Sequence, residues 1–312
     1  MNKGKVISLV IPTFNEDLDT LSSLESEINA LILSNLEEKF EVILVDDSTK
    51  TTCRSTVKNM CITNGWKGVF FTRNFGKEAA IRAGLEKSNG DAVIILDADL
   101  QDPISLIPKM ITTWQNMDTL VVLAKRIDRS SDSFLKRKLS GVFYTVINKL
   151  SDVHIPTNVG DFRLIDKKVV ESVLKLNERN IFMKGIFAWT GYPTVTLEYV
   201  RPARESGDSK FPFRRLLRIA TDGIVSFSSL PLRLWSYLGI LIAIGNTIFM
   251  LYIIAMKLTG QIQDSGYASL IVVSTFTLSM NLICFGIFGE YISRMFLEVK
   301  ARPHYLILEE TN

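Results

Sequence analysis

Short apolar runs alternate with amphipathic stretches over the first 125 residues. The apolar runs predict five strands, at residues 6–11, 41–45, 68–72, 92–96 and 120–124. Between them, apolar residues recur at helical spacing and predict four helices, at 19–34, 51–61, 77–88 and 103–115. Continuous apolar strands separated by helices are typical of a mostly parallel sheet that is covered on both faces. We therefore expect an α/β fold.

Polar and acidic pairs follow four of these strands directly. They are Asn15-Glu16, Asp46-Asp47, Arg73-Asn74 and the pair Asp97 and Asp99. Because parallel strands end at a common edge, where α/β sheets bind ligands, these side chains should converge on one site. Residues 160–164 and 194–200 predict two more strands, and residues 133–148 predict a basic amphipathic helix.

Two later segments, 234–256 and 267–289, carry no charged side chain and exceed the roughly 20 residues that cross a bilayer core. They predict a membrane hairpin; two buried helices of a large soluble core are the alternative. Arginine and lysine gather before and after the pair, whereas the loop 257–266 holds Lys257 alone, so both ends should be cytoplasmic. We expect a soluble domain (1–210), interfacial amphipathic helices (211–233), the membrane region (234–296) and a cytoplasmic tail (297–312).

Composition narrows the function classes. The formal net charge of +3 is too small to indicate nucleic-acid binding. Three cysteines in no paired arrangement are typical of a reducing compartment, and two histidines nearly exclude a histidine-built zinc site. The apolar run at the start is too short for a signal peptide, and it is better explained as the first strand.

The segment 97–102, Asp-Ala-Asp-Leu-Gln-Asp, is the strongest chemical motif. Two carboxylates at i and i+2, where a buried strand ends, can reach one hard cation, and Mg²⁺ or Mn²⁺ favours such oxygen ligands beside substrate phosphates. A turn with capping aspartates before Pro103 is the alternative.

Two further groups fit a phosphorylated ligand. The Asp46-Asp47 pair can accept hydrogen bonds from a base or a ribose, or it can simply cap the next helix. Arg73 and Lys77 flank a helix N-terminus, where phosphate oxygens bind, although an ordinary surface loop is equally open. The cluster 136–138 on the basic helix suits a lipid phosphate or a solvated helix face.

These motifs together resemble family 2 glycosyltransferases of the polyprenyl-phosphate type. The resemblance extends to dolichyl-phosphate mannose synthases and is greater to bactoprenol glucosyltransferases of bacteria and their phages. It is carried by IPTFNE, VDDS, RNFGKEAAIRAGL, DADLQDP, VLAKRIDRS, LKRK, NVGDFRLID, ERNIFMKG, RESGDSKF and DGIVSFSSLPLR, which occur in the family's order over essentially the whole chain. Many relatives have DGS where this chain has Asp47-Ser48, which can alter that turn.

The resemblance implies a GT-A type nucleotide-sugar-binding domain and assigns roles to residues. The implied metal ligands are Asp97, Asp99 and Gln101. The implied nucleotide-sugar contacts are Pro12, Asn15, Glu16, Asp46, Asp47, Lys77, Asp97 and Lys210. The implied lipid-phosphate contacts are Arg126, Arg137 and Ser140, and the implied catalytic residues are Asp99, Asp161 and Arg204.

The expected reaction is inverting transfer of a hexose, glucose from UDP-glucose, to undecaprenyl phosphate, with Mg²⁺ or Mn²⁺. We expect a multi-pass protein of the bacterial inner membrane that forms homo-oligomers through its membrane segments. A flippase and a membrane transferase would use its product downstream, for a surface glycan such as O-antigen. Asp161 is either a base or an orienting group, and the second is favoured because a phosphate dianion needs little help.

Alternative sugars and alternative functions are also consistent with parts of the sequence. Mannose, galactose, an amino sugar or a modified arabinose can replace glucose. A processive polysaccharide synthase would normally carry a Gln-x-x-Arg-Trp element and more spans, and a dinucleotide oxidoreductase would need GxGxxG after the first strand; the sequence has neither motif. A non-enzymatic membrane scaffold is disfavoured by the intact DADLQD motif.

Overall fold

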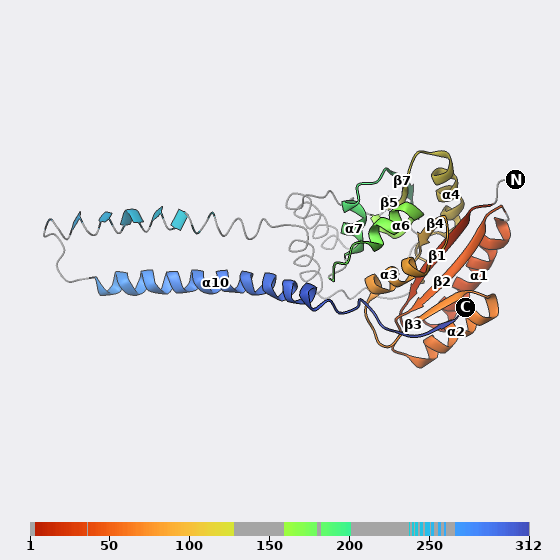
Figure 1. The fold of residues 1–312 in the computed structure, drawn as a ribbon, viewed down its shortest axis with the longest axis horizontal. Helices are drawn as coiled ribbons and strands as arrows, with labels where there is room; N and C mark the ends of the chain where they lie inside the picture. Colours follow the sequence, from red (N-terminus) through yellow and green to blue (C-terminus); the bar gives the residue numbers. More distant parts are fainter. Residues whose placement is uncertain are drawn as a thin grey trace.

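The structure is a computed structural model that describes residues 4–127 except 36, residues 159–179 and 182–200, scattered positions between 237 and 259, and residues 266–311. Its centre is an eight-stranded sheet of order β7-β5-β6-β4-β1-β2-β3-β8 (Figure 1). The strands are β1 (Val6–Thr13), β2 (Lys39–Asp46), β3 (Lys67–Phe71), β4 (Ala92–Ile95), β5 (Val121–Arg126), β6 (Val159–Asp166), β7 (Thr194–Tyr199) and β8 (Ile307–Thr311).

The helices lie on both faces of this sheet. They are α1 (Leu18–Ser34), α2 (Thr51–Asn64), α3 (Lys77–Lys87), η1 (Ile104–Leu106), α4 (Ile107–Asn116), α6 (Lys167–Leu174) and α7 (Met183–Trp189), whereas α10 (Tyr267–Lys300) does not pack on the sheet. One core cluster joins α1, α2 and α4 to the sheet, and the second joins α3, α6 and α7 to the opposite face. The prediction of an α/β fold with a sheet covered on both faces is confirmed.

Strands β1 to β4 follow the parallel scheme that the alternation of strands and helices predicts. β1 pairs in parallel with both β2 and β4, and β2 pairs in parallel with β3. β6 breaks the scheme because it runs antiparallel between β4 and β5. The sheet is therefore mostly parallel around its centre, and the carboxyl ends of β1, β2 and β4 share one edge.

Helix α3 approaches the sheet closely where it crosses β1. A Cβ atom on Gly84 would lie 2.2 Å from Val10 Cγ1, so glycine is needed at this contact. Ala80 and Ala83 on the same helix are fully buried. Small side chains thus let α3 pack tightly against the sheet, which fixes the position of its first residues, Lys77 and Glu78, at the edge.

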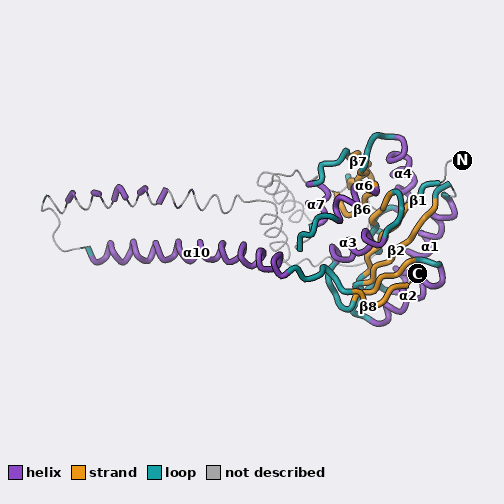
Figure 2. Tube along the Cα trace, viewed as in Figure 1, coloured by secondary structure: helices purple, strands orange, loops and turns teal. Residues whose placement is uncertain are grey.

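The end of the chain returns to the sheet. β8, at one edge of the sheet (Figure 2), pairs antiparallel with β3. The Tyr305 ring stacks on Phe71 with centroids 4.8 Å apart. Lys87 adds an ion pair with Glu310 at 2.6 Å. The expected cytoplasmic tail therefore contributes an edge strand, for which the sequence analysis predicted no element.

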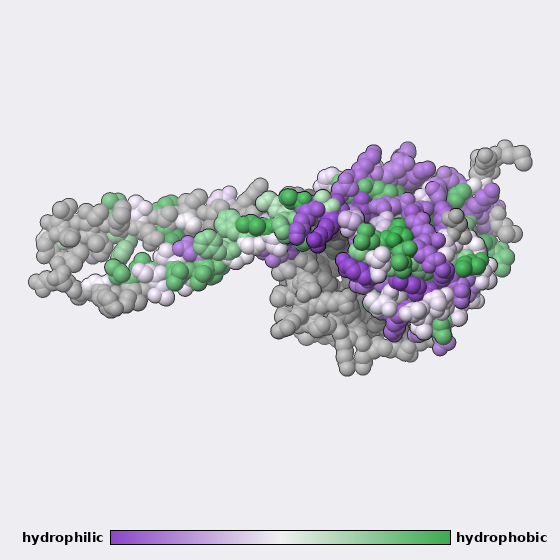
Figure 3. Space-filling model, turned by 60° about the horizontal axis from the view of Figure 1, so that its bottom comes forward, coloured by the Kyte–Doolittle hydropathy of each residue, from purple (hydrophilic) through white to green (hydrophobic). Residues whose placement is uncertain are grey.

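Helix α10 extends away from the sheet (Figure 1). Many of its large apolar side chains are exposed, Phe276, Phe285 and Phe288 among them, and Figure 3 shows hydrophobic side chains along this arm. Among the described residues, no helix meets both the length and the apolarity that a membrane crossing requires. The hairpin stays a prediction; the basic helix 133–148 and the interfacial helices 211–233 lie outside the described residues, as does part of 234–256.

Candidate functional site

A pocket of about 360 Å³ opens at the edge where β1, β2 and β4 end. Its volume falls within the range of roughly 300–1,000 Å³ that is usual for small-molecule sites. Six of the residues predicted to form the site line it, namely Pro12, Glu16, Asp47, Lys77, Asp97 and Asp99. The other lining residues are Thr13, Phe14, Asn74, Gly76, Ala80 and Ala98. The structure thus brings together the clusters after β1, β2, β3 and β4, and we call this cavity the first pocket.

Adjacent carboxylates Asp46 and Asp47 differ in their surroundings. Asp46 is fully buried, and its Oδ2 accepts a hydrogen bond from Arg54 Nε at 3.1 Å. Arg54 also donates to the carbonyl oxygens of Ser48 and Phe71. Asp46 therefore ties α2 to the ends of β2 and β3, and it does not line the first pocket.

Asp47 shapes the loop that leads from β3 into α3. Its carboxylate accepts hydrogen bonds from Asn74 Nδ2 at 2.7 Å, from the Phe75 N–H at 2.6 Å and from the Gly76 N–H at 2.8 Å. Burial raises the pKa of Asp47, although the two backbone hydrogen bonds oppose the shift. The carboxylate thus fixes one wall of the first pocket, just before Lys77.

Asn15 and Ser48 join the loops that follow β1 and β2. Asn15 has φ 56°, and its Oδ1 accepts hydrogen bonds from the N–H groups of Thr49 and Lys50 at 3.1 and 2.9 Å. The Ser48 hydroxyl accepts a hydrogen bond from the Asn15 N–H at 2.8 Å, which ties the turn after Asp47 to the loop after β1. Asn15 acts on the shape of the site, since it is not among the residues that line the first pocket.

A chain of charges crosses the edge from β4 to β6. Lys77 Nζ lies 2.6 Å from Asp97 Oδ1 and 2.7 Å from Asp161 Oδ2, and it donates a hydrogen bond to Asp97 Oδ2 at 2.9 Å. Asp161 lies at an irregularity of β6: Leu123 pairs with Arg163, but Lys125 pairs with Val159. Such bulges re-aim side chains next to functional sites.

The electrostatic field at Asp161 favours its ionised form. Burial raises the pKa of this carboxyl, but the positive charges of Lys184, Lys77 and Arg163 outweigh burial and lower the pKa to about 2. Conversely, burial lowers the pKa of Lys77, and the carboxylates of Asp161 and Asp97 raise it above its usual value. Both partners of this ion pair are therefore charged at neutral pH.

Three other carboxyls show the opposite tendency. Burial raises the pKa of Asp97, and burial with the neighbouring charge of Asp99 raises that of Glu16. Burial, assisted by the charge of Asp161, raises the pKa of Glu78 to about 7. Glu78 Oε2 accepts the Met183 N–H at 3.2 Å, so this carboxyl links α3 to α7.

The acidic motif after β4 fits a divalent cation. Asp97 Oδ1 is buried and makes no hydrogen bond despite its short ion-pair distance to Lys77. Asp99 Oδ1 accepts the Gln101 N–H at 3.2 Å. Within the described residues, no three or more His, Cys, Asp or Glu side chains form a group that could hold a metal ion. Two carboxylates nevertheless suit Mg²⁺ or Mn²⁺, which often completes its shell with substrate phosphates and water.

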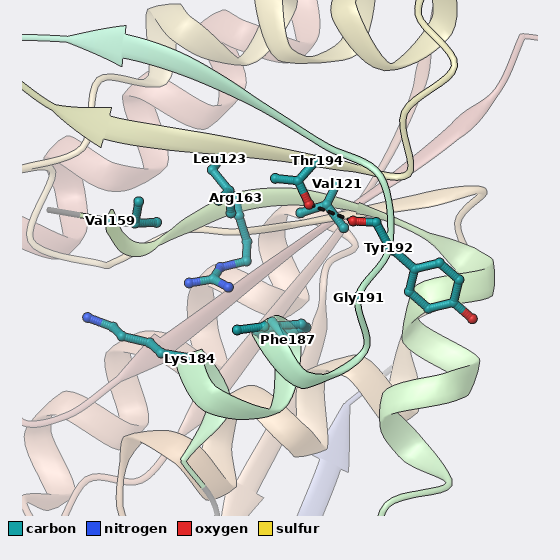
Figure 4. Close-up of a pocket in the computed structure, with 10 residues that line it drawn as sticks. Val121, Leu123, Val159, Arg163, Lys184, Phe187, Gly191, Tyr192 and Thr194 are labelled. Atoms are coloured by element: carbon teal, nitrogen blue, oxygen red, sulfur yellow. Dashed lines mark hydrogen bonds between the residues drawn. The ribbon is translucent and has the colours of Figure 1, made fainter. Parts of the chain in front are cut away.

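A second pocket, of about 140 Å³, lies between β5, β6 and α7 (Figure 4). Its apolar wall includes Val121, Leu123 and Phe187, and its polar lining includes Arg163 and Lys184. The sequence alone predicts no role for Lys184, Phe187 or Glu78. The signals were present, since Lys184 lies in ERNIFMKG and Glu78 follows Lys77, but neither pattern shows that α7 folds onto β5 and β6.

Some predicted site residues remain to be placed. Arg126 ends β5 and is partly buried. Arg137, Ser140, Arg204 and Lys210 lie outside the described residues.

Comparison with known proteins identifies related sequences. Residues 8–174 match the family model "Glycosyl transferase family 2". The bactoprenol glucosyl transferase of Shigella phage SfX is 42% identical over 309 residues, covering 96% of this chain and 98% of that protein. The prophage bactoprenol glucosyl transferase homolog of Escherichia coli K12 is also 42% identical, over 96% of this chain and 98% of that protein. Among solved structures, the mannosyltransferase PcManGT from Pyrobaculum calidifontis in complex with GDP-Man and Mn²⁺ is 15% identical with a TM-score of 0.45, covering 96% of this chain and 88% of that one.

Proposed function

The chain belongs to glycosyl transferase family 2 and is a glycosyltransferase, and we propose that it transfers glucose from UDP-glucose to undecaprenyl phosphate with inversion at the anomeric carbon. The observation that carries this proposal is the 42% identity, over 96% of the chain, to a bactoprenol glucosyl transferase. The first pocket, with its acidic rim at the end of β4, supplies the matching site for a nucleotide-sugar.

The donor binds in the first pocket. Pro12, Glu16 and Asp47 face the nucleotide, with Asn15 and Asp46 holding the loops beneath it. Asp97, Asp99 and Gln101 would hold a divalent cation, which would neutralise the negative charge on the donor diphosphate. Lys77 lies at the same rim and offers a further positive charge to the phosphates.

The acceptor provides its own nucleophile. A phosphate monoester has a second pKa near ~6 and is largely dianionic at neutral pH, so it needs little help from a base. One of its oxygens forms a bond to the anomeric carbon, while the bond from that carbon to the β-phosphate oxygen breaks and UDP departs with the electron pair. Single displacement inverts the configuration, so an α-linked donor gives a β-linked product.

In this mechanism, Asp161 positions the charged side chain of Lys77. Its pKa of about 2 makes it a poor proton acceptor at neutral pH, and its ion pair holds Lys77 at the donor rim. We assign the lipid phosphate to Arg126, Arg137 and Ser140, and closure over the donor to Arg204 and Lys210. These assignments rest on the family resemblance.

The proposed location is the bacterial inner membrane, with the catalytic domain and both termini cytoplasmic. The exposed apolar side chains of α10 support contact with lipid. A hairpin at 234–256 and 267–289 would hold the domain near its lipid substrate and raise the effective concentration of that substrate. We further propose homo-oligomers through these segments, and a flippase and a membrane transferase acting downstream on the product.

An assay with purified full-length protein tests the function. Undecaprenyl phosphate is incubated with labelled UDP-glucose, UDP-galactose, GDP-mannose, an amino-sugar nucleotide or a modified-arabinose donor, with and without EDTA. We expect a single glucosyl transfer that EDTA abolishes and that Asp99→Ala lowers by at least about 100-fold. Asp118→Asn, at an exposed position, is the matched control. Preference for another donor, repeated addition of sugars, or full activity of Asp99→Ala would contradict the corresponding part of the proposal.

A further inference from the structure

The second pocket combines positive charge with an apolar wall. Its volume of about 140 Å³ equals the liquid volume of roughly five water molecules, which is room for a group of phosphate size. Val121, Leu123 and Phe187 form the apolar side. Figure 4 shows the nitrogen-bearing ends of Arg163 and Lys184 on the side of the pocket where Val159 lies.

The two cations are held differently. Arg163 is 4% exposed, donates to the Gly160 carbonyl oxygen at 2.7 Å, and lies over the Phe187 ring at 4.6 Å from its centroid. Lys184 forms no ion pair of 4 Å or less with any residue in the described part of the chain, although its charge acts on Asp161. A partly buried ammonium without a close counter-ion favours an anionic ligand.

The sheet order places the second pocket beside the first, further along the sheet. β4, β6 and β5 are successive neighbours. Asp97 follows β4, Asp161 lies in β6, and the second pocket lies against β6 and β5. Asp161 therefore lies between the two pockets. In a single displacement, the incoming oxygen and the departing diphosphate stand on opposite sides of the anomeric carbon, so the acceptor phosphate needs a site distinct from the diphosphate site, and the second pocket is the neighbouring candidate.

We propose that the second pocket binds the phosphomonoester group of the acceptor, with Lys184 as its principal cation and the apolar wall against the first carbons of the lipid chain. This inference rests on the proposed function. Lys184 would work beside Arg126 rather than in its place, and Arg163 forms the rigid, positively charged floor.

Direct binding to the full-length protein in detergent tests the site without turnover. Calorimetry compares farnesyl phosphate, farnesol, inorganic phosphate and UDP as ligands of wild-type protein, Lys184→Met and Lys184→Arg. We expect Lys184→Met to lower the affinity for farnesyl phosphate by about 10- to 100-fold, the usual range for the loss of a charge-assisted hydrogen bond. Farnesol and UDP should bind as before, and Lys184→Arg should retain most of the affinity.

Two further variants serve as a charge control and as an independent test of the pocket. Lys175→Met removes an exposed lysine that follows α6 and should leave all four affinities unchanged. Ala188→Phe fills the second pocket from α7 and should lower the affinity for farnesyl phosphate as Lys184→Met does. Unchanged farnesyl phosphate binding in Lys184→Met and Ala188→Phe, with UDP binding intact, would overturn the inference. Equal affinity for inorganic and farnesyl phosphate would overturn the role of the apolar wall.

The inference and the proposed function can fail separately. If wild-type protein glucosylates undecaprenyl phosphate but Lys184→Met keeps the same KM for it, the function stands and the inference falls. If no nucleotide-sugar supports transfer but farnesyl phosphate binding depends on Lys184, the anion site stands and the proposed function falls.

Discussion

Exchange of Glu78 for glutamine should stabilise the protein at alkaline pH and have much less effect at acidic pH. Glu78 is the second residue of α3, and its carboxyl accepts the Met183 N–H of α7. Burial and the negative charge of Asp161 raise its pKa to about 7. Glutamine keeps an oxygen that can accept the same N–H but never acquires the charge.

The magnitude follows from the shift of this pKa. For an acid whose pKa rises from 4.5 in the unfolded chain to about 7 in the fold, the stabilisation is complete below pH 4.5 and is lost as the pH rises through 7. At ~1.4 kcal/mol per pH unit, the free energy of unfolding falls, relative to the glutamine variant, by about 1 kcal/mol at pH 5.5 and by about 3 kcal/mol at pH 8.5. The gap between the two proteins should therefore widen by about 2 kcal/mol.

Thermal unfolding of the full-length protein in detergent measures this gap. A change of about 2 kcal/mol corresponds to roughly 4–8 °C in Tm for a domain of about 200 residues. Glu27→Gln, on the exposed side of α1, is the control and should show no such pH dependence. A difference in Tm between wild type and Glu78→Gln that stays constant from pH 5.5 to 8.5 would refute the reasoning.

Three other changes probe the site and the fold. Asp161→Asn should lower kcat by about 100-fold and the free energy of unfolding at pH 7 by about 2 kcal/mol, because it removes the partner of Lys77. The stabilisation from this carboxylate is complete above pH 3.8 and is lost only as the pH falls through about 2. A wild-type kcat profile with an Asp161-dependent limb between pH 5 and 9 would therefore argue against its orienting role. Asp47→Asn replaces one of the carboxylate oxygens that accept backbone N–H groups with an NH₂ group, which cannot accept them. Calorimetry should find that UDP binds about tenfold more weakly to this variant. Wild-type affinity for UDP would exclude the loop-fixing role of Asp47. Tyr305→Ala removes the ring stacked on Phe71 and should lower the free energy of unfolding by about 3 kcal/mol. Tyr305→Phe keeps the ring and should retain most of the wild-type free energy of unfolding. If both variants lose the same amount, the effect belongs to the hydroxyl and not to the ring.

The sequence predicts the local elements of this fold well because hydrophobic periodicity reports burial. The strands predicted at 6–11 and 92–96 differ from β1 and β4 by only one or two residues at an end. β8 escaped prediction because a five-residue strand of sequence Ile-Leu-Glu-Glu-Thr gains its structure from pairing with the edge of β3, about 240 residues earlier in the chain.

Some residues of the candidate site can be predicted from the sequence, and others become evident only from the structure. Position at the end of a strand was enough to place Asp97 and Asp99 at the sheet edge. It did not distinguish Asp46 from Asp47, because neighbouring side chains of an extended chain point to opposite sides, and only the structure shows that Arg54 engages the first of them. Lys184 is further from prediction still, since its role depends on how α7 packs across β5 and β6.

The two pockets differ in the sign of their charge, and this difference has a chemical consequence. Among the described residues that line it, the first pocket presents four carboxylates, Glu16, Asp47, Asp97 and Asp99, and one cation, Lys77, so added positive charge would help a nucleotide diphosphate to bind there. The second pocket presents Arg163 and Lys184, and it can receive an anion directly. An enzyme with the proposed function joins two anionic substrates and needs this asymmetry, because the departing diphosphate must be neutralised as its charge grows, whereas the incoming phosphate must keep its charge to remain a nucleophile. A general base would have no proton to remove, which agrees with a carboxylate between the pockets that stays ionised beside Lys77.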